Sequence, residues 1–193
     1  MQPQKQNSDS PRSWYVLKTT YNREQKMADM LIRHGFHAYV AQKYKWTRPD
    51  GDEEAELESI IPNVLFAYLS HQELMSIFSG SDSAYPTLTS GVSYIRSSAT
   101  KENSGHPISI SDSEMQNFIL ATSTHDKNII VLNRGNYTLK SDNDVQVTVG
   151  PYKGVCGKLI RAQRQQRVLV SLPHLISIGT PYIPTNCLQE LNP

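Results

Sequence analysis

Hydrophobic positions near the start of the chain follow the period of a strand, then a helix, then a second strand. Residues 13–20 (SWYVLKTT) are rich in aromatic and β-branched residues, which is typical of a strand. In residues 22–35, apolar side chains recur at helical spacing, with Asn22 as the predicted N-cap and Gly35 as the predicted stop. Residues 36–46 (FHAYVAQKYKW) predict the second strand. This order indicates a βαβ unit.

The segment IIPNVLFAYLS, residues 60–70, predicts an apolar strand. Alternation along a strand places Val64, Phe66 and Tyr68 on one face, and Leu65, Ala67 and Leu69 on the other. Helices that cover one face of a sheet bury only one of these sets. The second set must then meet something else, which favours a partner surface.

Two serine–glutamate pairs, Ser70–Glu73 and Ser111–Glu114, have the spacing of a capping box and predict the first turns of two further helices. Residues 92–96 (VSYIR) predict a fourth strand. The order β-α-β-β-α-β-α predicts an α+β fold, with helices packed on an antiparallel or mixed sheet.

From Tyr137 onwards, short strands and turns without a helix predict a small β-barrel. Its most unusual segment is VTVGPYKGVCGKLIRAQRQQRVLV, residues 147–170. A P-loop needs glycine where Tyr152 stands and serine or threonine where Leu159 stands, so a phosphate cradle is excluded. The glycines instead predict a tight bend between strands, and a hairpin turn is expected near residues 162–166.

The pattern divides the chain into a disordered tail (residues 1–12), an N-terminal α+β domain (13–122), a linker with a short strand (123–136) and the barrel (137–193). Charge supports two modules. Residues 1–125 hold 11 Lys+Arg and 14 Asp+Glu, a net charge of −3, whereas residues 126–193 hold 8 and 4, a net charge of +4. Six acids between Asp50 and Glu58 indicate a solvated hairpin tip or a contact with a basic partner.

Composition narrows the classes of function. No run approaches the ~20 apolar residues of a membrane helix, and the polar N-terminus is not a secretory signal, so we expect a cytoplasmic protein without a membrane contact. Cys156 and Cys187 lack a C-x-x-C spacing and are expected to be buried thiols. The histidines form no zinc set, and no nucleophile motif is present. We therefore expect no enzyme, no metal site and no cofactor.

Four cations, Lys158, Arg161, Arg164 and Arg167, lie on or beside the predicted hairpin. They can attract nucleic-acid phosphates, or they can form a solvated edge that protects a sheet from aggregation. No aromatic residue interleaves with them to stack bases, and this favours the edge role slightly.

Three segments resemble, in order and spacing, the NusG-type bacterial transcription elongation factors: WYVLKTTYNREQKMADML, IPNVLFAYLS and VTVGPYKGVCGKLI. The first two resemble the N-terminal domain of that family. The third resembles its KOW motif, with matching positions Gly150, Pro151, Tyr152, Gly154 and Gly157. The resemblance covers residues 13–191. PNVLF and the TPYIPTNCLQEL tail look like those of specialised paralogues of the RfaH and UpxY groups, because the general factor usually has P-G-Y at the first of these positions.

The resemblance implies a ferredoxin-like α/β sandwich domain followed by a small SH3-like KOW barrel. It also implies a monomeric antitermination factor that docks on the β′ clamp helices of RNA polymerase and promotes processive transcription of a restricted set of operons, those for capsular polysaccharide in the UpxY group. In such factors the KOW domain recruits a ribosomal protein or Rho, or contacts RNA. A KOW-type RNA-binding or ribosome-associated protein is the alternative function.

Two sets of site residues carry over from the resemblance. The positions matching the clamp-helix contact are Tyr15, Leu17, Ile61, Pro62, Asn63, Val64 and Phe66. The positions matching a contact to non-template DNA or leader RNA are Thr20, Tyr21, Arg23 and Lys26. A helix N-terminus with two cations and an aromatic residue can bind phosphate and stack a base, whereas the alternative is an ordinary solvated helix start.

Overall fold

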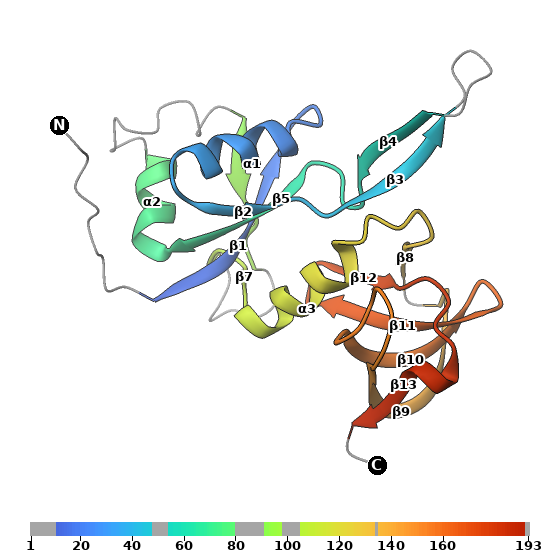
Figure 1. The fold of residues 1–193 in the computed structure, drawn as a ribbon. Helices are drawn as coiled ribbons and strands as arrows, with labels where there is room; N and C mark the ends of the chain where they lie inside the picture. Colours follow the sequence, from blue (N-terminus) through green and yellow to red (C-terminus); the bar gives the residue numbers. More distant parts are fainter. Residues whose placement is uncertain (1–10, 48–53, 80–90, 98–104, 134, 192–193) are drawn as a thin grey trace. The chain divides into compact units, whose positions relative to one another are not determined.

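The structure is a computed structural model of the 193-residue chain, and it describes residues 11–47, 54–79, 91–97, 105–133 and 135–191. Within these residues the chain is mostly sheet, with three helices (Figure 1): α1 (Glu24–Arg33), α2 (His71–Ser79) and α3 (Asp112–Thr122). This mixture agrees with the predicted α+β class. Residues 1–10 of the predicted tail and the expected Asp50–Gly51 turn lie outside the described residues.

The chain forms two compact units, whose boundaries differ from those predicted from the sequence. The first unit holds Met1–Val40 and Asn63–Ser109, and the second holds Ala41–Pro62 and Ile110–Pro193. Helix α3 and residues 41–62 were expected in the N-terminal domain. Both fall in the second unit, where α3 contacts β11 (Gln165–Leu172), and the domain boundaries predicted from the sequence stay a prediction.

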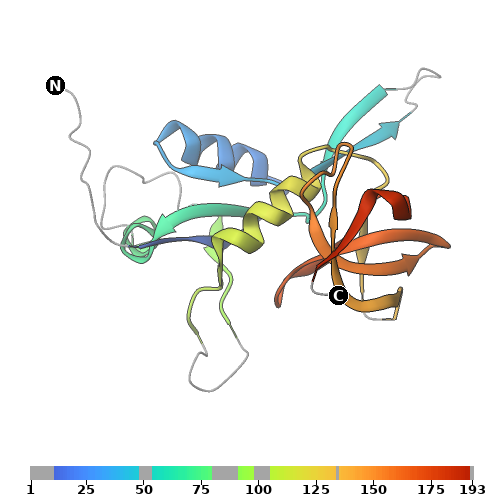
Figure 2. The same cartoon turned by 60° about the horizontal axis from the view of Figure 1, so that its bottom comes forward.

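A five-stranded sheet organises the first unit. Its strands, in sheet order, are β2 (His37–Tyr39), β5 (Val64–Ser70), β1 (Arg12–Thr19) and β6 (Val92–Tyr94), and β7 (Ser109–Ile110) also pairs with β1. Both β1 and β2 are antiparallel to β5, so they run parallel to each other. Helices α1 and α2 share one apolar core with this sheet (Figures 1 and 2).

Both faces of this sheet are buried at its centre. Leu17 pairs with Leu65 on the face of the α1 and α2 core, and Val16 pairs with Phe66 on the opposite face. The predicted alternation of β5 is therefore confirmed. At the centre of the second face Val16 and Phe66 are both 0% exposed, and the expected partner surface on this face stays a prediction.

Two of three predicted helix starts are confirmed. Ser111 and Glu114 form a complete capping box at α3, and Ser70 and Glu73 exchange the same pair of hydrogen bonds at α2. The prediction that Asn22 caps α1 is wrong. The N-cap is Arg23, without a side-chain cap.

A six-stranded sheet organises the second unit. Its strands, in sheet order, are β13 (Leu188–Leu191), β9 (Thr138–Val147), β10 (Cys156–Ala162), β11 (Gln165–Leu172), β12 (Ile176–Gly179) and β8 (Ile130–Leu132). Strand β8 lies in the segment predicted as a linker. It belongs to the sheet because it pairs with β12. Strands β10 and β11 are interior strands of this sheet, each paired on both sides.

A separate hairpin precedes β5. The segment predicted as one strand over residues 36–46 is two strands: β2, and β3 (Gln42–Thr47) of the second unit. Strand β3 pairs with β4 (Glu54–Ser59). Several of the acids expected at a hairpin tip lie on β4 instead, where Glu58 is 3.5 Å from Lys45.

The glycine-rich segment turns the chain between β9 and β10, as predicted. Gly154 N donates to Val147 O at 2.7 Å, and Val147 N donates to Val155 O at 2.9 Å. Gly150 and Gly154 have φ of +85° and +95°, a region that side chains with a Cβ atom rarely adopt. These glycines therefore form a backbone bend and not a phosphate loop.

Candidate functional site

The junction between β1 and α1 presents a tyrosine to solvent. Tyr21 is 89% exposed, and no other large hydrophobic side chain among the described residues is as exposed. Tyr21 and the next residue, Asn22, both have a left-handed backbone, with φ of 59° and 51°. This conformation is unfavourable for residues other than glycine and asparagine, so the surrounding contacts must maintain it.

Asn63 holds this junction in place. Its Oδ1 accepts from Asn22 N at 2.8 Å, and its carbonyl oxygen accepts from Thr19 N at 2.8 Å. Asn63 is itself left-handed, with φ 62°, which glycine and asparagine tolerate better than other residues. The structure thus places Asn63, predicted as a polymerase contact, beneath the candidate nucleic-acid residues.

The cations of this junction differ in accessibility. Arg23 is half-buried and donates to Thr20 O at 3.1 Å and to Thr20 Oγ1 at 3.0 Å. Lys26 is exposed. Gly91 lies against the guanidinium of Arg23, where a Cβ atom would collide with it. The structure therefore brings Thr20, Tyr21, Arg23 and Lys26 into one surface, with Arg23 fixed and Lys26 open to solvent.

The helix N-terminus itself is already occupied by an acid. Glu24 is the first residue of α1 and is 4% exposed. A carboxylate at this end of a helix interacts favourably with the backbone dipole. Phosphate binding at this junction would therefore rely on the two cations and not on the helix amides.

The predicted docking residues do not form one surface. Tyr15 and Leu17 belong to the core shared with α1 and α2, and burial raises the pKa of Tyr15. Val64 and Phe66 lie on the opposite face of the sheet and are 8% and 0% exposed. All four side chains are buried, and their role in docking stays a prediction.

Ile61 and Pro62 are more accessible. They contribute to a cleft of about 540 Å³ in the second unit, lined mostly by apolar residues of segments 60–62, 131–133 and 171–177. Pro62 is exposed and Ile61 is half-buried. Of the seven predicted docking residues, these two line an open apolar surface.

The matching KOW positions have structural roles in the second unit. The hydroxyl of buried Tyr152 hydrogen-bonds with Thr124 Oγ1 at 2.9 Å, and burial raises the pKa of Tyr152. A side chain at Gly157 would overlap the carbonyl oxygen of Leu169 on the neighbouring strand. Pro151 is exposed in the turn.

The four cations of the β10–β11 hairpin differ in burial and in their partners. Arg167 is 3% exposed, and its Nη1 donates to Asn128 O at 2.9 Å and to Thr180 O at 2.6 Å; burial lowers its pKa. Lys158 lies 3.4 Å from Asp144. Arg161 and Arg164 are exposed. The four cations therefore differ in accessibility and in their partners.

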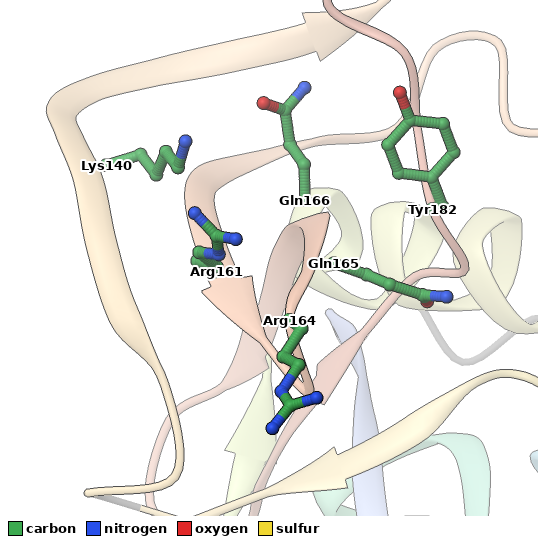
Figure 3. A pocket seen from close by; sticks show the side chains of 6 residues that line it. All are labelled: Lys140, Arg161, Arg164, Gln165, Gln166 and Tyr182. Atoms are coloured by element: carbon green, nitrogen blue, oxygen red, sulfur yellow. The ribbon is translucent and has the colours of Figure 1, made fainter.

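The tertiary structure adds two residues that the sequence reasoning missed. Lys140 from β9 and Tyr182 after β12 line the same cleft as Arg161 and Arg164 (Figure 3). The missed signal was the PYIP segment, where a tyrosine stands between two prolines.

Comparison with known proteins identifies the family. Residues 12–119, more than half of the 193-residue chain, match the family described as NusG, transcription termination factor nusG. The chain belongs to the NusG family. Among solved structures, NusG of Thermotoga maritima, described under "Domain interaction in Thermotoga maritima NusG", is similar at 15% identity and a TM-score of 0.45, over 94% of this chain and 98% of that one. No curated protein matches the sequence significantly.

The NusG family is one of non-enzymatic transcription factors that bind RNA polymerase. In the described parts of this NusG-family chain, no three His, Cys, Asp or Glu residues are grouped in a way that could hold a metal ion. None of the helices described is long and apolar enough to cross a membrane.

Proposed function

We propose that this chain is a transcription antitermination factor that docks on the β′ clamp helices of bacterial RNA polymerase and promotes processive transcription of a restricted set of operons. The family match over residues 12–119 carries the proposal, because NusG-family factors act on transcription through RNA polymerase. In this proposal the protein is a cytoplasmic monomer that suppresses pausing and termination on its target operons.

The proposed fold is a ferredoxin-like domain followed by an SH3-like KOW barrel. Two observations support it. The order β2-β5-β1-β6, with β1 and β2 parallel and separated by β5, is that of a split βαβ unit. The glycine-rich bend between β9 and β10 coincides with the residues that resemble the KOW motif.

The proposed specialisation, similar to the RfaH and UpxY groups, is supported by Asn63. Its left-handed backbone accepts either the asparagine of the specialised paralogues or the glycine of the general factor. Asparagine adds an acceptor for Asn22 N, which glycine lacks. The substitution therefore fixes the Tyr21 junction more firmly. We propose that the target operons are those for capsular polysaccharide.

The Tyr21 junction is the proposed contact to exposed non-template DNA. An 89% exposed aromatic ring beside Lys26 can stack one unpaired base and attract its phosphate. Asn63 acts as a positioning residue, because it bonds to the backbone at both ends of this junction.

Docking on the clamp helices is tested by pull-down of the full chain with a β′ clamp-helix fragment. We expect one-to-one capture, which Ile61→Asp and Pro62→Asp weaken because both residues line an apolar cleft. Tyr21→Ser is the matched control and should leave capture unchanged. Co-purification with ribosomal subunits instead of polymerase core would favour the ribosome-associated alternative.

Contact with the non-template strand is tested by crosslinking in a paused elongation complex. Tyr21→Ser should abolish crosslinks to the exposed strand. Asn63→Gly should reduce them, since the backbone stays allowed while the Asn22 hydrogen bond is lost. Unchanged crosslinks in both variants would remove this role from the junction. Occupancy along the whole genome, measured by chromatin precipitation, would point to a general factor.

A further inference from the structure

A cleft in the second unit gathers three cations and an exposed aromatic ring. It has a volume of about 330 Å³ and is lined by Lys140, Arg161, Arg164, Gln165, Gln166 and Tyr182 (Figure 3). Strand β9, the β10–β11 hairpin and the segment after β12 each contribute. No ion pair joins Lys140, Arg161 or Arg164 to a carboxylate whose side chain the structure describes. The cleft is therefore a concentration of uncompensated positive charge.

Tyr182 is held in its exposed position. Gln166 Nε2 donates to Ile183 O at 3.0 Å and to Thr185 Oγ1 at 3.2 Å, and Ile183 N donates to Gln166 O at 3.2 Å. Ile183 is 6% exposed and anchors the segment, whereas the preceding Tyr182 is 55% exposed. Because prolines on both sides restrict the backbone, little conformational freedom is lost when the ring contacts a ligand.

Arg164 occupies an unfavourable backbone position. Gln163 and Arg164 form the two-residue turn between Ala162 and Gln165, with φ of 50° and 64°. A hairpin turn with two positive φ values favours asparagine and glycine. An arginine there lowers the stability of the turn while it extends a guanidinium beside the cleft, and such strain is commonly retained for function.

Protection of a sheet edge does not account for Arg161. Arg161 lies on β10 and pairs with Thr138 of β9 on one side and with Gln166 of β11 on the other, so its position is not a sheet edge. The basic segment itself has no aromatic residue that could stack a base. Tyr182 supplies that ring from another segment of the same cleft.

We propose that this cleft binds single-stranded nucleic acid, with phosphates on Lys140, Arg161 and Arg164 and one unpaired base stacked on Tyr182. A base stacks well on an aromatic ring, and the neighbouring cations neutralise the backbone on either side of it. An acidic peptide would use the cations but would leave the ring without a role. The proposal does not depend on polymerase docking or on the Tyr21 junction of the first unit.

The test is fluorescence anisotropy of the full chain with a fluorescein-labelled uridine 12-mer, without polymerase. Each neutralised phosphate contributes about −0.7 to the slope of log K against log salt on a single strand. Three cations predict a slope of about −2, which corresponds to an affinity about 15-fold lower at 200 mM than at 50 mM KCl. A thymidine deoxyoligonucleotide shows whether RNA is preferred, and either preference fits the stacking chemistry.

Variants of the ring and the turn separate stacking from charge. Tyr182→Leu should weaken binding about tenfold at constant salt slope, and Tyr182→Phe should retain it. Arg164→Gly should lower the slope by about 0.7 and at the same time raise the melting temperature, because glycine relieves the turn. A binding defect in a more stable protein cannot result from misfolding. Lys158→Gln is the matched control, since Lys158 pairs with Asp144 outside the cleft and should leave the slope unchanged.

Three results would overturn the proposal. One is a salt slope near zero. Another is binding of a 12-residue glutamate peptide with the same affinity as the oligonucleotide, if Tyr182→Leu leaves the peptide affinity unchanged. That result would identify an acidic-peptide site. The third is loss of all binding in the Tyr21→Ser and Lys26→Gln double variant while cleft variants bind normally, which would assign the oligonucleotide to the first unit.

Discussion

The guanidinium of Arg167 donates a 2.6 Å hydrogen bond to the carbonyl oxygen of Thr180. The same Nη1 atom reaches Asn128 O at 2.9 Å, and Nη2 donates to Gln165 Oε1 at 2.7 Å. One buried cation thus joins β11 to two segments without regular structure. This arrangement makes Arg167 a structural residue of the second unit, although it lies only three positions from the exposed Arg164.

Arg167→Ala should destabilise the second unit by about 3 kcal/mol, because buried hydrogen bonds to a charged donor are lost and their acceptors stay unpaired. The urea midpoint of the full chain measures this change. The exposed Arg161→Ala is the control and should change stability by less than about 0.5 kcal/mol. Equal midpoints for the two variants would contradict the structural role.

Gly157→Ala should destabilise the chain by about 3 kcal/mol, because the added methyl group overlaps the carbonyl of Leu169 and forces interior strands apart. Gly150→Ala is the matched variant in the same glycine-rich segment. There, no atom lies within 4 Å of the added methyl group, so only the left-handed backbone opposes it, at about 1 kcal/mol. Comparison of the two urea midpoints separates close packing from backbone strain, and a larger loss for Gly150→Ala would refute the packing argument.

Phe66→Ala should destabilise the first unit by about 3–5 kcal/mol, as expected for a large side chain with no exposed surface. A docking residue would behave differently, with a normal thermal melt and weaker capture of the β′ clamp-helix fragment. The two measurements are made side by side, with Tyr21→Ala as the exposed control. A normal melt with reduced capture would show that Phe66 becomes accessible when the partner binds.

Stability should fall as the pH rises above 10. Burial raises the pKa of Tyr152 above that of an exposed tyrosine, so the folded state favours the neutral phenol. This contribution is complete below pH 10 and decreases as the pH rises toward the folded pKa. Tyr152→Phe should flatten the pH dependence of the melting temperature, apart from a remaining slope from Tyr15, whose pKa is also raised by burial. An unchanged dependence would show that Tyr152 does not titrate with folding.

Tyr152→Phe should also lower the free energy of unfolding by about 1 kcal/mol at neutral pH, because the hydrogen bond to Thr124 is lost. Thr124→Ala removes the same hydrogen bond and keeps the phenol. It should reproduce the loss at neutral pH but retain the decrease above pH 10.

Sequence reasoning succeeded where the cause is local. Ser111 and Glu114 specify their helix start because a capping box needs only residues three positions apart. Gly35 follows α1 with φ +85°, as expected of a glycine that stops a helix. It failed for Asn22, whose backbone amide is bound by Asn63, 41 positions away in the sequence.

The sequence by itself determined the family, the alternation of strands and helices, and the bends at the glycine-rich segment, since these depend on motifs, periodicity and the φ preferences of single residues. Only the tertiary structure decided which side chains are accessible. Burial depends on packing between distant segments. The sequence pattern therefore does not show that Arg167 and Phe66 are buried while Arg164 is exposed. The same long-range packing places Lys140 and Tyr182 around one cleft, a grouping that no sequence spacing reveals.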